Sequence, residues 1–317
     1  MLLLVLSGCV TPAIEIEQKA SQETSKDALK ETLKETLVVI HGGGGGHWLP
    51  NSRNAVINSV QAFKNEGYSK AIHAIEVDVV LTQDQQLVLS HDPWVNKELC
   101  VTSEGNHPGH SLIKNLSLRE IQQRYVCGHR ALEDFPKAEA KPESIMSVEE
   151  MLLALIDTPD LAIYLDVKIQ EEATAGEVAY ARAIEEVLDR VPVQNEIYIE
   201  GPTVEALHAY RSHITHSYQS ILSYPPFYAG ENWTLVGALA LVKTYFNADL
   251  PIEQAQEVAA NFVSSPVQIL SRSAVQGLQD QQIGVILYTA NDEESFEQAC
   301  QLGPDFIITD YPELAPC

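Results

Sequence analysis

Basic residues are scarce in this chain of 317 residues, because 20 Lys and Arg stand against 44 Asp and Glu and give a net charge of −24. Proteins that bind nucleic acid hold its phosphates on basic surfaces, so this balance argues against nucleic acid as a partner. Any anionic substrate must be held by a locally positive group, such as a metal ion or a well-placed lysine, despite the negative charge of the whole chain. Long apolar runs are also missing, and none reaches the roughly 18 residues of a membrane-spanning helix.

Cysteine is rare as well, and the first of the five lies in an informative place. Met1–Leu6 is apolar, and Leu-Ser-Gly-Cys ends at Cys9. This tetrapeptide resembles the bacterial lipoprotein cleavage box, in which the cysteine is lipidated. We expect residues 1–8 to be a lipoprotein-type signal segment that begins upstream of Met1, since no Lys or Arg precedes the apolar run. A chance match at the end of a buried strand is the alternative.

Residues 9–36 are rich in Glu, Lys, Thr, Gln and Ser and are expected to form a polar tether behind the lipid. The protein would then be exported and held at the membrane of the bacterial cell envelope, on its periplasmic side or at the cell surface, by an N-terminal lipid anchor. Four cysteines remain, and an even number fits export. Cys100–Cys127 would close a loop and Cys300–Cys317 would tie down the C-terminus, with four buried free thiols as the alternative.

The stretch Ala74–Pro93 consists of two apolar runs joined by the polar turn Thr82–Gln86. Five residues cannot carry a crossover between parallel strands, so we predict an antiparallel hairpin. Side chains two apart share one face of a strand, so Glu76 and Asp78 point the same way. Two such carboxylates invite a divalent cation, and His91 ends the return strand within reach of it.

Strands alternate with helices along the rest of the chain, which is typical of parallel β/α units. Setting the return strand aside, eight strand candidates begin near residues 37, 74, 161, 196, 217, 261, 284 and 305. We therefore predict one α/β domain at 37–317, a (β/α)8 TIM barrel with the hairpin as an excursion after its second strand. An open doubly wound sheet is the alternative. Val95–Lys141 is expected to be an irregular insertion that contains one helix.

A barrel gathers its chemistry where the strands end. His41 ends the first strand, Glu76 and Asp78 lie on the second, and Asp166 and Lys168 lie on the third. Two carboxylate-bearing pairs and a histidine on three successive parallel strands predict a functional site. A core salt bridge between Asp166 and Lys168 is the structural alternative.

This pattern resembles the glycerophosphodiester phosphodiesterase family, with matches in the family's order from about Val38 to the end of the chain. The matching segments are His41-Gly42-Gly43 for the family's His-Arg-Gly, Ile75–Asp92 for its Glu-x-Asp hairpin and second histidine, Asp166-Val167-Lys168 for its Glu-x-Lys, Tyr288–Asp292 for its Trp-Thr-x-Asn strand, and Phe306–Glu313 for its closing strand.

The resemblance implies a phosphodiesterase that cleaves small-molecule or lipid phosphodiesters, in particular glycerophosphodiesters, to an alcohol and glycerol phosphate. One divalent cation is expected, Mg²⁺ or Ca²⁺, because its ligands are all hard oxygens. The expected roles are a metal site at Glu76, Asp78 and Asp166, acid/base catalysis by His41 and His91, charge stabilisation by Lys168, and substrate contacts from Lys168, Tyr288 and Asn291. For Tyr288 and Asn291 a packing role is the alternative.

The chain also departs from the family pattern. Gly42 replaces the Arg, Ile57 replaces a Glu, Asp166 shortens a Glu and Tyr288 replaces a Trp. An Asp-x-Lys without that Arg is similar to sphingomyelinase D-type phospholipases, which form a cyclic phosphate by intramolecular attack. A non-catalytic binding lipoprotein is the third alternative. The sequence leaves the head group, the oligomeric state and the assignment of the acid histidine open.

Overall fold

The computed structural model describes residues 36–44, 46–65, 72–130, 132, 135–170, 172–225, 239, 242, 243, 247 and 249–314. The expected signal segment, Cys9, nearly all of the tether and Cys317 lie outside the described residues. Within the described part of the chain, no helix is both long and apolar enough to cross a bilayer.

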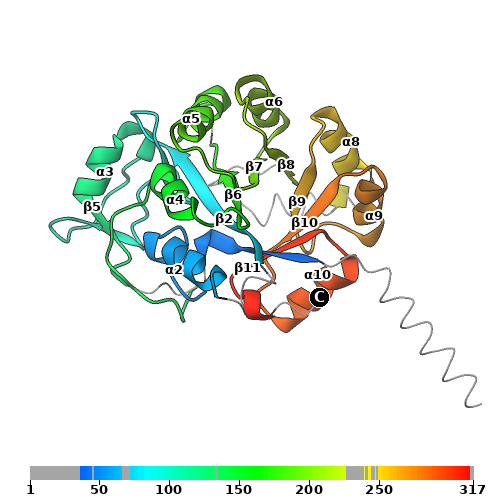
Figure 1. Cartoon of the computed structure of the whole chain (residues 1–317), viewed down its shortest axis with the longest axis horizontal. Helices are drawn as coiled ribbons and strands as arrows, with labels where there is room; N and C mark the ends of the chain where they lie inside the picture. Colours follow the sequence, from blue (N-terminus) through cyan, green and yellow to red (C-terminus); the bar gives the residue numbers. More distant parts are fainter. Residues whose placement is uncertain are drawn as a thin grey trace, which may run out of the picture. The chain divides into compact units, whose positions relative to one another are not determined.

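Eight parallel strands close into a barrel (Figure 1). In spatial order they are β1 (Leu37–Ile40), β2 (Ile72–Leu81), β6 (Ala162–Val167), β7 (Ile197–Gly201), β8 (Gln219–Ser223), β9 (Phe262–Pro266), β10 (Gly284–Tyr288) and β11 (Phe306–Thr309). β1 closes the ring by pairing with both β11 and β2. The predicted TIM barrel is confirmed, and so is the hairpin, because β3 (Leu87–Leu89) pairs antiparallel with β2.

Helices surround the strands in Figure 1. Those described around the barrel are α2 (Arg53–Phe63), α4 (Val148–Leu155), α5 (Glu177–Arg190), α6 (Val204–His213), α8 (Leu250–Glu257), α9 (Arg272–Asp280) and α10 (Glu293–Leu302). Side-chain caps start several of them, and α4 begins with a capping box of Ser147 and Glu150. The sequence reading missed α8, a two-turn helix with proline in its first turn.

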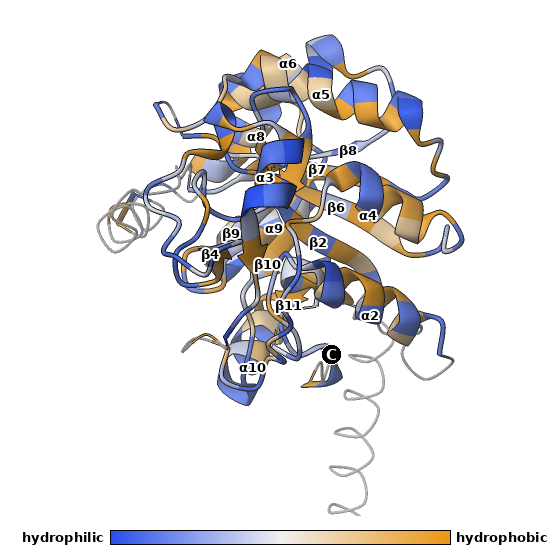
Figure 2. Ribbon diagram, turned by 90° about the vertical axis from the view of Figure 1, so that its left-hand side faces the viewer, coloured by the Kyte–Doolittle hydropathy of each residue, from blue (hydrophilic) through white to orange (hydrophobic). Residues whose placement is uncertain are grey.

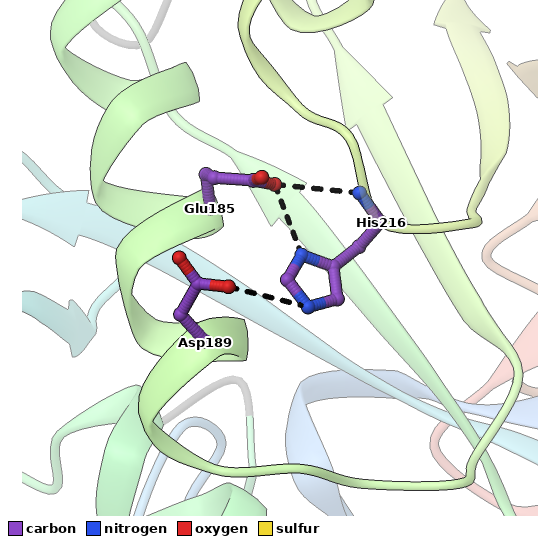
Figure 3. A group of neighbouring side chains, drawn as sticks. All are labelled: Glu185, Asp189 and His216. Atoms are coloured by element: carbon purple, nitrogen blue, oxygen red, sulfur yellow. Dashed lines mark hydrogen bonds and ion pairs between the residues drawn. The ribbon is translucent and has the colours of Figure 1, made fainter.

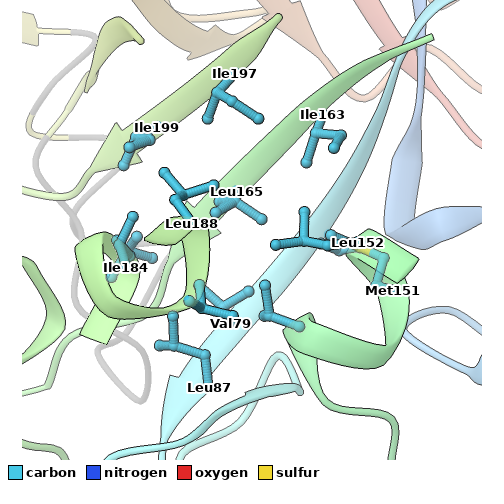
Figure 4. Packing of buried hydrophobic residues seen from close by; sticks show 14 of the residues in the cluster. Val79, Leu87, Met151, Leu152, Ile163, Leu165, Ile184, Leu188, Ile197 and Ile199 are labelled. Carbon is cyan, nitrogen blue, oxygen red and sulfur yellow. The ribbon is translucent and has the colours of Figure 1, made fainter. Parts of the chain in front are cut away.

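The core consists of two apolar layers separated by the barrel wall. Outside the wall, strand residues such as Val79 and Leu165 pack against Leu152 of α4 and Ile184 of α5 (Figure 4). Inside it, an aromatic-rich cluster fills the barrel toward the amino ends of the strands and includes Tyr164, Tyr198, Phe262 and Phe306. Apolar side chains therefore fill the barrel near the amino ends of the strands, and polar side chains begin nearer the carboxyl ends.

The insertion after the hairpin has its own small sheet. β4 (Cys100–Thr102) pairs antiparallel with β5 (Tyr125–Cys127), and α3 (Leu118–Arg124) lies between them in the sequence. Figure 2 shows α3 as mainly hydrophilic, whereas β2 and β6 are mainly hydrophobic. Three-residue strands are too short to show an alternating pattern, so the sequence reading gave this segment one helix only.

The structure contains the Cys100–Cys127 disulfide, which joins β4 to β5. Cys300 is also disulfide-bonded. Its expected partner, Cys317, lies outside the described residues, so the second pairing remains a prediction.

Candidate active site

The carboxyl ends of the strands bring the predicted polar residues to one mouth of the barrel. Asp78 of β2 lies opposite Asp166 of β6, and Asp166 lies opposite Glu200 of β7. A cavity of about 540 Å³ opens there. Its lining includes seven of the eight residues expected to act in catalysis, metal binding or substrate binding: His41, Glu76, Asp78, His91, Asp166, Lys168 and Tyr288.

Three carboxylates converge in this cavity. Glu76, Asp78 and Asp166 each offer an oxygen, and these atoms lie within 4.8 Å of one another. Glu76 and Asp78 are buried and Asp166 is half-buried. Buried carboxylates need a compensating positive charge, and oxygen donors suit Mg²⁺ or Ca²⁺. The donor set therefore fits one hard divalent cation.

Lys168 supplies part of that positive charge. Its Nζ lies 2.8 Å from Asp78 Oδ1 and 2.6 Å from Asp166 Oδ2. Burial opposes its charge, but Asp166 and Asp78 raise the pKa of Lys168 well above its ordinary value. The salt bridge offered as the structural alternative is thus present, and it lies in the cavity wall rather than in the apolar core.

The pKa values of the two carboxylates of β2 shift in opposite directions. Burial, then the charge of Asp78, raises the pKa of Glu76 well above its ordinary value. Burial has the same tendency at Asp78, but Lys168, followed by His91 and His41, lowers the pKa of Asp78 below its ordinary value. Glu76 therefore holds its proton to a higher pH than Asp78 does.

Asn51 is a site residue that the sequence reading missed. Its Nδ2 donates to Asp78 Oδ2 at 2.6 Å, and the backbone N–H of Asp78 donates to Asn51 Oδ1 at 2.9 Å. This double contact holds the Asn51 amide against Asp78 and fixes the position of Oδ2. Asn51 follows a glycine-rich loop rather than a strand and belongs to none of the motifs in the sequence reading.

Gly42 explains one departure from the family pattern. Its backbone N–H donates to Glu76 Oε2 at 2.7 Å, so the loop helps to orient this carboxylate. Its φ is +56°, and a Cβ at this position would come within 2.6 Å of Pro50 Cβ. An arginine cannot occupy position 42 unless Pro50 and the loop move.

His41 is held by the last strand of the barrel. Its Nδ1 lies 2.8 Å from Asp310 Oδ1. Burial lowers the pKa of His41, but the hydrogen bond to Asp310 and the nearby charges, Glu76 first, outweigh this and raise it to about 9. Because Nδ1 is engaged, Nε2 is the nitrogen that can exchange a proton in the cavity.

His91 has a similar arrangement at the mouth of the cavity. Its Nδ1 lies 3.2 Å from Asp92 Oδ1, and its side chain is 61% exposed, against 29% for His41. The charge of Asp78, then the hydrogen bond to Asp92, raises the pKa of His91. Both rings thus pair one nitrogen with a carboxylate, which fixes ring orientation and favours the protonated form.

Tyr288 and Asn291, the two residues expected to contact substrate from a late strand, differ in their position relative to the cavity. Tyr288 lines the cavity. Asn291 is not among the lining residues; its Nδ2 donates to Asp310, and the backbone N–H of Asp310 donates to Asn291 Oδ1 at 2.8 Å. Asn291 therefore holds the residue that holds His41, which corresponds to the packing alternative.

Glu200 is a second residue that the sequence reading missed. It is buried at the end of β7, lines the cavity, and accepts hydrogen bonds from the hydroxyls of Tyr164 and Ser223. Burial, then the charge of Asp166, raises the pKa of Glu200 to about 8. A signal was available, because Glu200 follows an apolar strand run in the same way as Asp166.

A second group of metal-ligand type lies on the outside of the barrel (Figure 3). Glu185 and Asp189 are one turn apart on α5, and His216 precedes β8. The His216 ring places Nδ1 3.0 Å from Glu185 Oε2 and Nε2 3.7 Å from Asp189 Oδ1. Thr215 also donates its backbone N–H and hydroxyl to Glu185. These groups satisfy one another, so the cluster ties α5 to the segment before β8.

Comparisons with known proteins agree with this geometry. The model of the Glycerophosphoryl diester phosphodiesterase family matches residues 41–314. None of the curated proteins compared matches the chain.

Several solved structures share the fold. A phosphodiesterase from Oleispira antarctica, in complex with the product sn-glycerol-3-phosphate, has a TM-score of 0.65 and 18% identity, over 88% of this chain and 94% of that one. The glycerophosphodiester phosphodiesterase from Thermotoga maritima has a TM-score of 0.58 and 15% identity, over 89% and 97% of the two chains. That from Agrobacterium tumefaciens has a TM-score of 0.60 and 14% identity, over 89% and 99%.

Proposed function

The chain belongs to the glycerophosphoryl diester phosphodiesterase family, a family of phosphoric diester hydrolases, and on this premise we propose that it hydrolyses glycerophosphodiesters to an alcohol and glycerol phosphate. One observation carries the proposal: three carboxylates, a lysine and two histidines from distant parts of the sequence line a single cavity. A binding protein that had lost turnover would have no need to keep both histidines paired with carboxylates.

Glu76, Asp78 and Asp166 are proposed to hold one divalent cation, with Mg²⁺ preferred and Ca²⁺ second. When bound, such a cation acts as a Lewis acid that neutralises phosphoryl oxygens. Asn51 and the N–H of Gly42 keep the first two carboxylates oriented, and second contacts of this kind tune metal affinity.

The side chains around this group perform the remaining chemistry. Lys168 adds a fixed positive charge toward the phosphoryl group, where negative charge develops in the transition state. His41 and His91 divide the proton transfers: one ring takes a proton from the attacking water, and the other gives a proton to the leaving alkoxide oxygen. A new P–O bond to water forms while the P–O bond to the alcohol breaks.

The direct test measures choline release from glycerophosphocholine with Mg²⁺, with Ca²⁺ and with EDTA. We expect release that depends on the cation and is lost in Asp166→Asn, while the exposed control Asp160→Asn keeps the wild-type rate. If no cation supports turnover of any glycerophosphodiester, the proposal is wrong.

The two histidines are distinguished by the leaving group. A diester with a p-nitrophenyl leaving group needs no acid, so it should restore turnover to the variant that lacks the acid but not to the one that lacks the base. His41→Asn and His91→Asn are the variants to compare. If this substrate restored both equally, the division of roles between them would be wrong.

A second candidate reaction is cyclic-phosphate formation by a hydroxyl of the substrate, as in sphingomyelinase D-type phospholipases. The observation that favours it is Gly42, where any Cβ would collide with Pro50 and the family's arginine is therefore excluded, together with the Asp-x-Lys at Asp166. Phosphorus NMR of the products decides: glycerol phosphate supports hydrolysis by water, and a cyclic phosphate supports the internal attack.

We also propose that the enzyme is exported and anchored in the cell envelope through a lipid on Cys9. The Leu-Ser-Gly-Cys sequence supports this, as does the Cys100–Cys127 disulfide, because such bonds persist in oxidising compartments. Radiolabelled palmitate should enter the wild-type protein in bacteria and not the Cys9→Ala variant. Equal labelling of the two would exclude the anchor.

A further inference from the structure

One wall of the catalytic cavity is apolar and comes from the insertion after the hairpin. Leu99, Leu132 and Phe135 line this wall and are half-buried. Leu99 packs partly on the core of the insertion, but Leu132 and Phe135 belong to none of the hydrophobic clusters among the described residues. Their apolar surface therefore faces the same cavity that holds the carboxylates.

Hydrogen bonds hold this wall in place. The carbonyl of Leu99 accepts from the backbone N–H of Gly128 and from Nδ1 of His129, both at 2.8 Å. The Cys100–Cys127 disulfide adjoins both Leu99 and Gly128 in the sequence.

Backbone hydrogen bonds also hold the second part of the wall, which carries Leu132 and Phe135. The N–H of Phe135 donates to the carbonyl of Leu132 at 3.1 Å, and the N–H of Ala138 donates to the carbonyl of Phe135 at 3.0 Å. The N–H of Glu139 then donates to the carbonyl of His47 at 3.0 Å, which connects this segment to the loop after β1. The apolar side chains are thus carried by a braced segment.

The cavity is larger than its polar half requires. Its volume of about 540 Å³ is that of a pocket for a drug-sized ligand. A glycerol phosphate is much smaller and has no apolar surface to match Leu132 and Phe135. An aliphatic chain would cover these side chains and remove apolar surface of both partners from water.

Building on the proposed function, we propose that Leu99, Leu132 and Phe135 form an apolar subsite for an aliphatic chain on the glycerol part of the substrate. The preferred substrates are then phosphodiesters that carry one such chain, rather than fully water-soluble glycerophosphodiesters. The polar centre handles the phosphoryl group of both classes, and the insertion distinguishes between them.

A matched series of substrates tests this subsite. Glycerophosphocholine and lysophosphatidylcholines with butanoyl to octanoyl chains, used below their aggregation limits, all release choline and differ only in the chain. We expect kcat/KM to rise about two- to fourfold with each added methylene until the subsite is full. A kcat/KM that stays flat with chain length, while glycerophosphocholine is turned over, overturns the inference. Failure of every substrate would instead refute the proposed function.

Variants locate the effect in the named residues. We expect Phe135→Ser and Leu132→Ser to reduce the ratio of kcat/KM for the octanoyl substrate to that for glycerophosphocholine at least tenfold, and Phe135→Leu to restore much of it. Leu153→Ser is the matched control, because Leu153 is an apolar residue of α4 that is 54% exposed. It should leave the ratio at the wild-type value. An unchanged ratio in both serine variants would refute the subsite.

A membrane surface is the other source of an aliphatic chain. Long-chain lysophosphatidylcholine in phosphatidylcholine vesicles provides that arm of the experiment. If chain preference were seen only with vesicles and were unaffected by Phe135→Ser, it would come from surface binding, and the subsite would be refuted. Preference for the monomeric chains, lost in Phe135→Ser, supports the subsite.

Discussion

Lys168 gives the sharpest test of how the acidic centre is held together. Its Nζ contacts Asp78 and Asp166 within 2.8 Å, and its side chain is only 20% exposed. Lys168→Met keeps an unbranched side chain that is one atom shorter and removes the charge. In EDTA, the variant leaves two carboxylates facing each other across β2 and β6 without an ammonium between them.

The size of the effect follows from this burial. Removing one partner of a buried ion pair costs about 3–5 kcal/mol, and the partial exposure of Lys168 favours the lower value of about 3 kcal/mol. For a domain of this size, 1 kcal/mol changes Tm by about 2–4 °C, so we expect Tm in EDTA to fall by about 6–12 °C. A bound cation replaces the lost charge, so Mg²⁺ should raise Tm more in Lys168→Met than in the wild type.

The stability that Lys168→Met loses relative to the wild type should also depend on pH. Lys168 lowers the pKa of Asp78, so the stability that this pair contributes is present above the ordinary pKa of aspartate, about 4, and is lost as pH falls through the depressed value. The difference between variant and wild type should therefore be nearly as large at pH 5 as at pH 7, and it should shrink only as pH falls well below 4.

Differential scanning calorimetry in EDTA and in Mg²⁺ measures both effects. Lys64→Met is the matched control, because Lys64 is exposed just after α2. We also expect kcat for glycerophosphocholine to fall about 10²–10³-fold in Lys168→Met, because a charge aimed at the transition state is lost. If Lys168→Met matched the wild-type Tm in EDTA at pH 7, our account of charge compensation in the cavity would be wrong.

Three further predictions concern the metal, a buried acid and the disulfide. Asp166→Asn should weaken Mg²⁺ binding at least tenfold in isothermal titration calorimetry, and an unchanged affinity would place the cation elsewhere. Glu200 keeps its proton up to a pKa of about 8 in the folded protein, against 4.5 ordinarily, so its contribution to stability falls as pH rises between these values. Glu200→Gln should remove a decline of about 1.4 kcal/mol per pH unit from urea unfolding in EDTA, and an identical pH profile in the two proteins would contradict this. Replacing Cys100 and Cys127 by serine opens a loop with a sequence separation of 27 and should cost about 3–4 kcal/mol, seen as a lower Tm than that of the wild type without reductant; an equal Tm would contradict this.

The sequence was sufficient for the eight barrel strands and for the charged pairs on two of them. Period-two spacing put Glu76 with Asp78 and Asp166 with Lys168, and the parallel β/α pattern put both pairs at one end of a barrel. The same reasoning extends to Glu200, which also ends an apolar strand. Its signal is weaker, because no second charged residue lies two positions away on the same face.

Contacts across the barrel could not be predicted in this way. Asp310 binds His41 from 269 residues away, and Asn51 binds Asp78 from a loop of glycines. These pairings depend on how the ring of strands closes and on the path of a loop, and neither leaves a periodic signal. The apolar wall of the insertion was hidden for the same reason, because neither Leu132 nor Phe135 lies in a helix or a strand.

The pairing of β1 with β11 has a consequence for the order in which the site is completed during folding. The ring is shut by residues near 37–40 and 306–309, and the imidazole of His41 gains its carboxylate partner only when both ends meet. A contact between the two ends of a chain is slow to form, because most of the polypeptide must be ordered first. On our proposal that His41 takes part in catalysis, a folding intermediate that still lacks its final strand has an incomplete site, however much of the preceding structure has already folded.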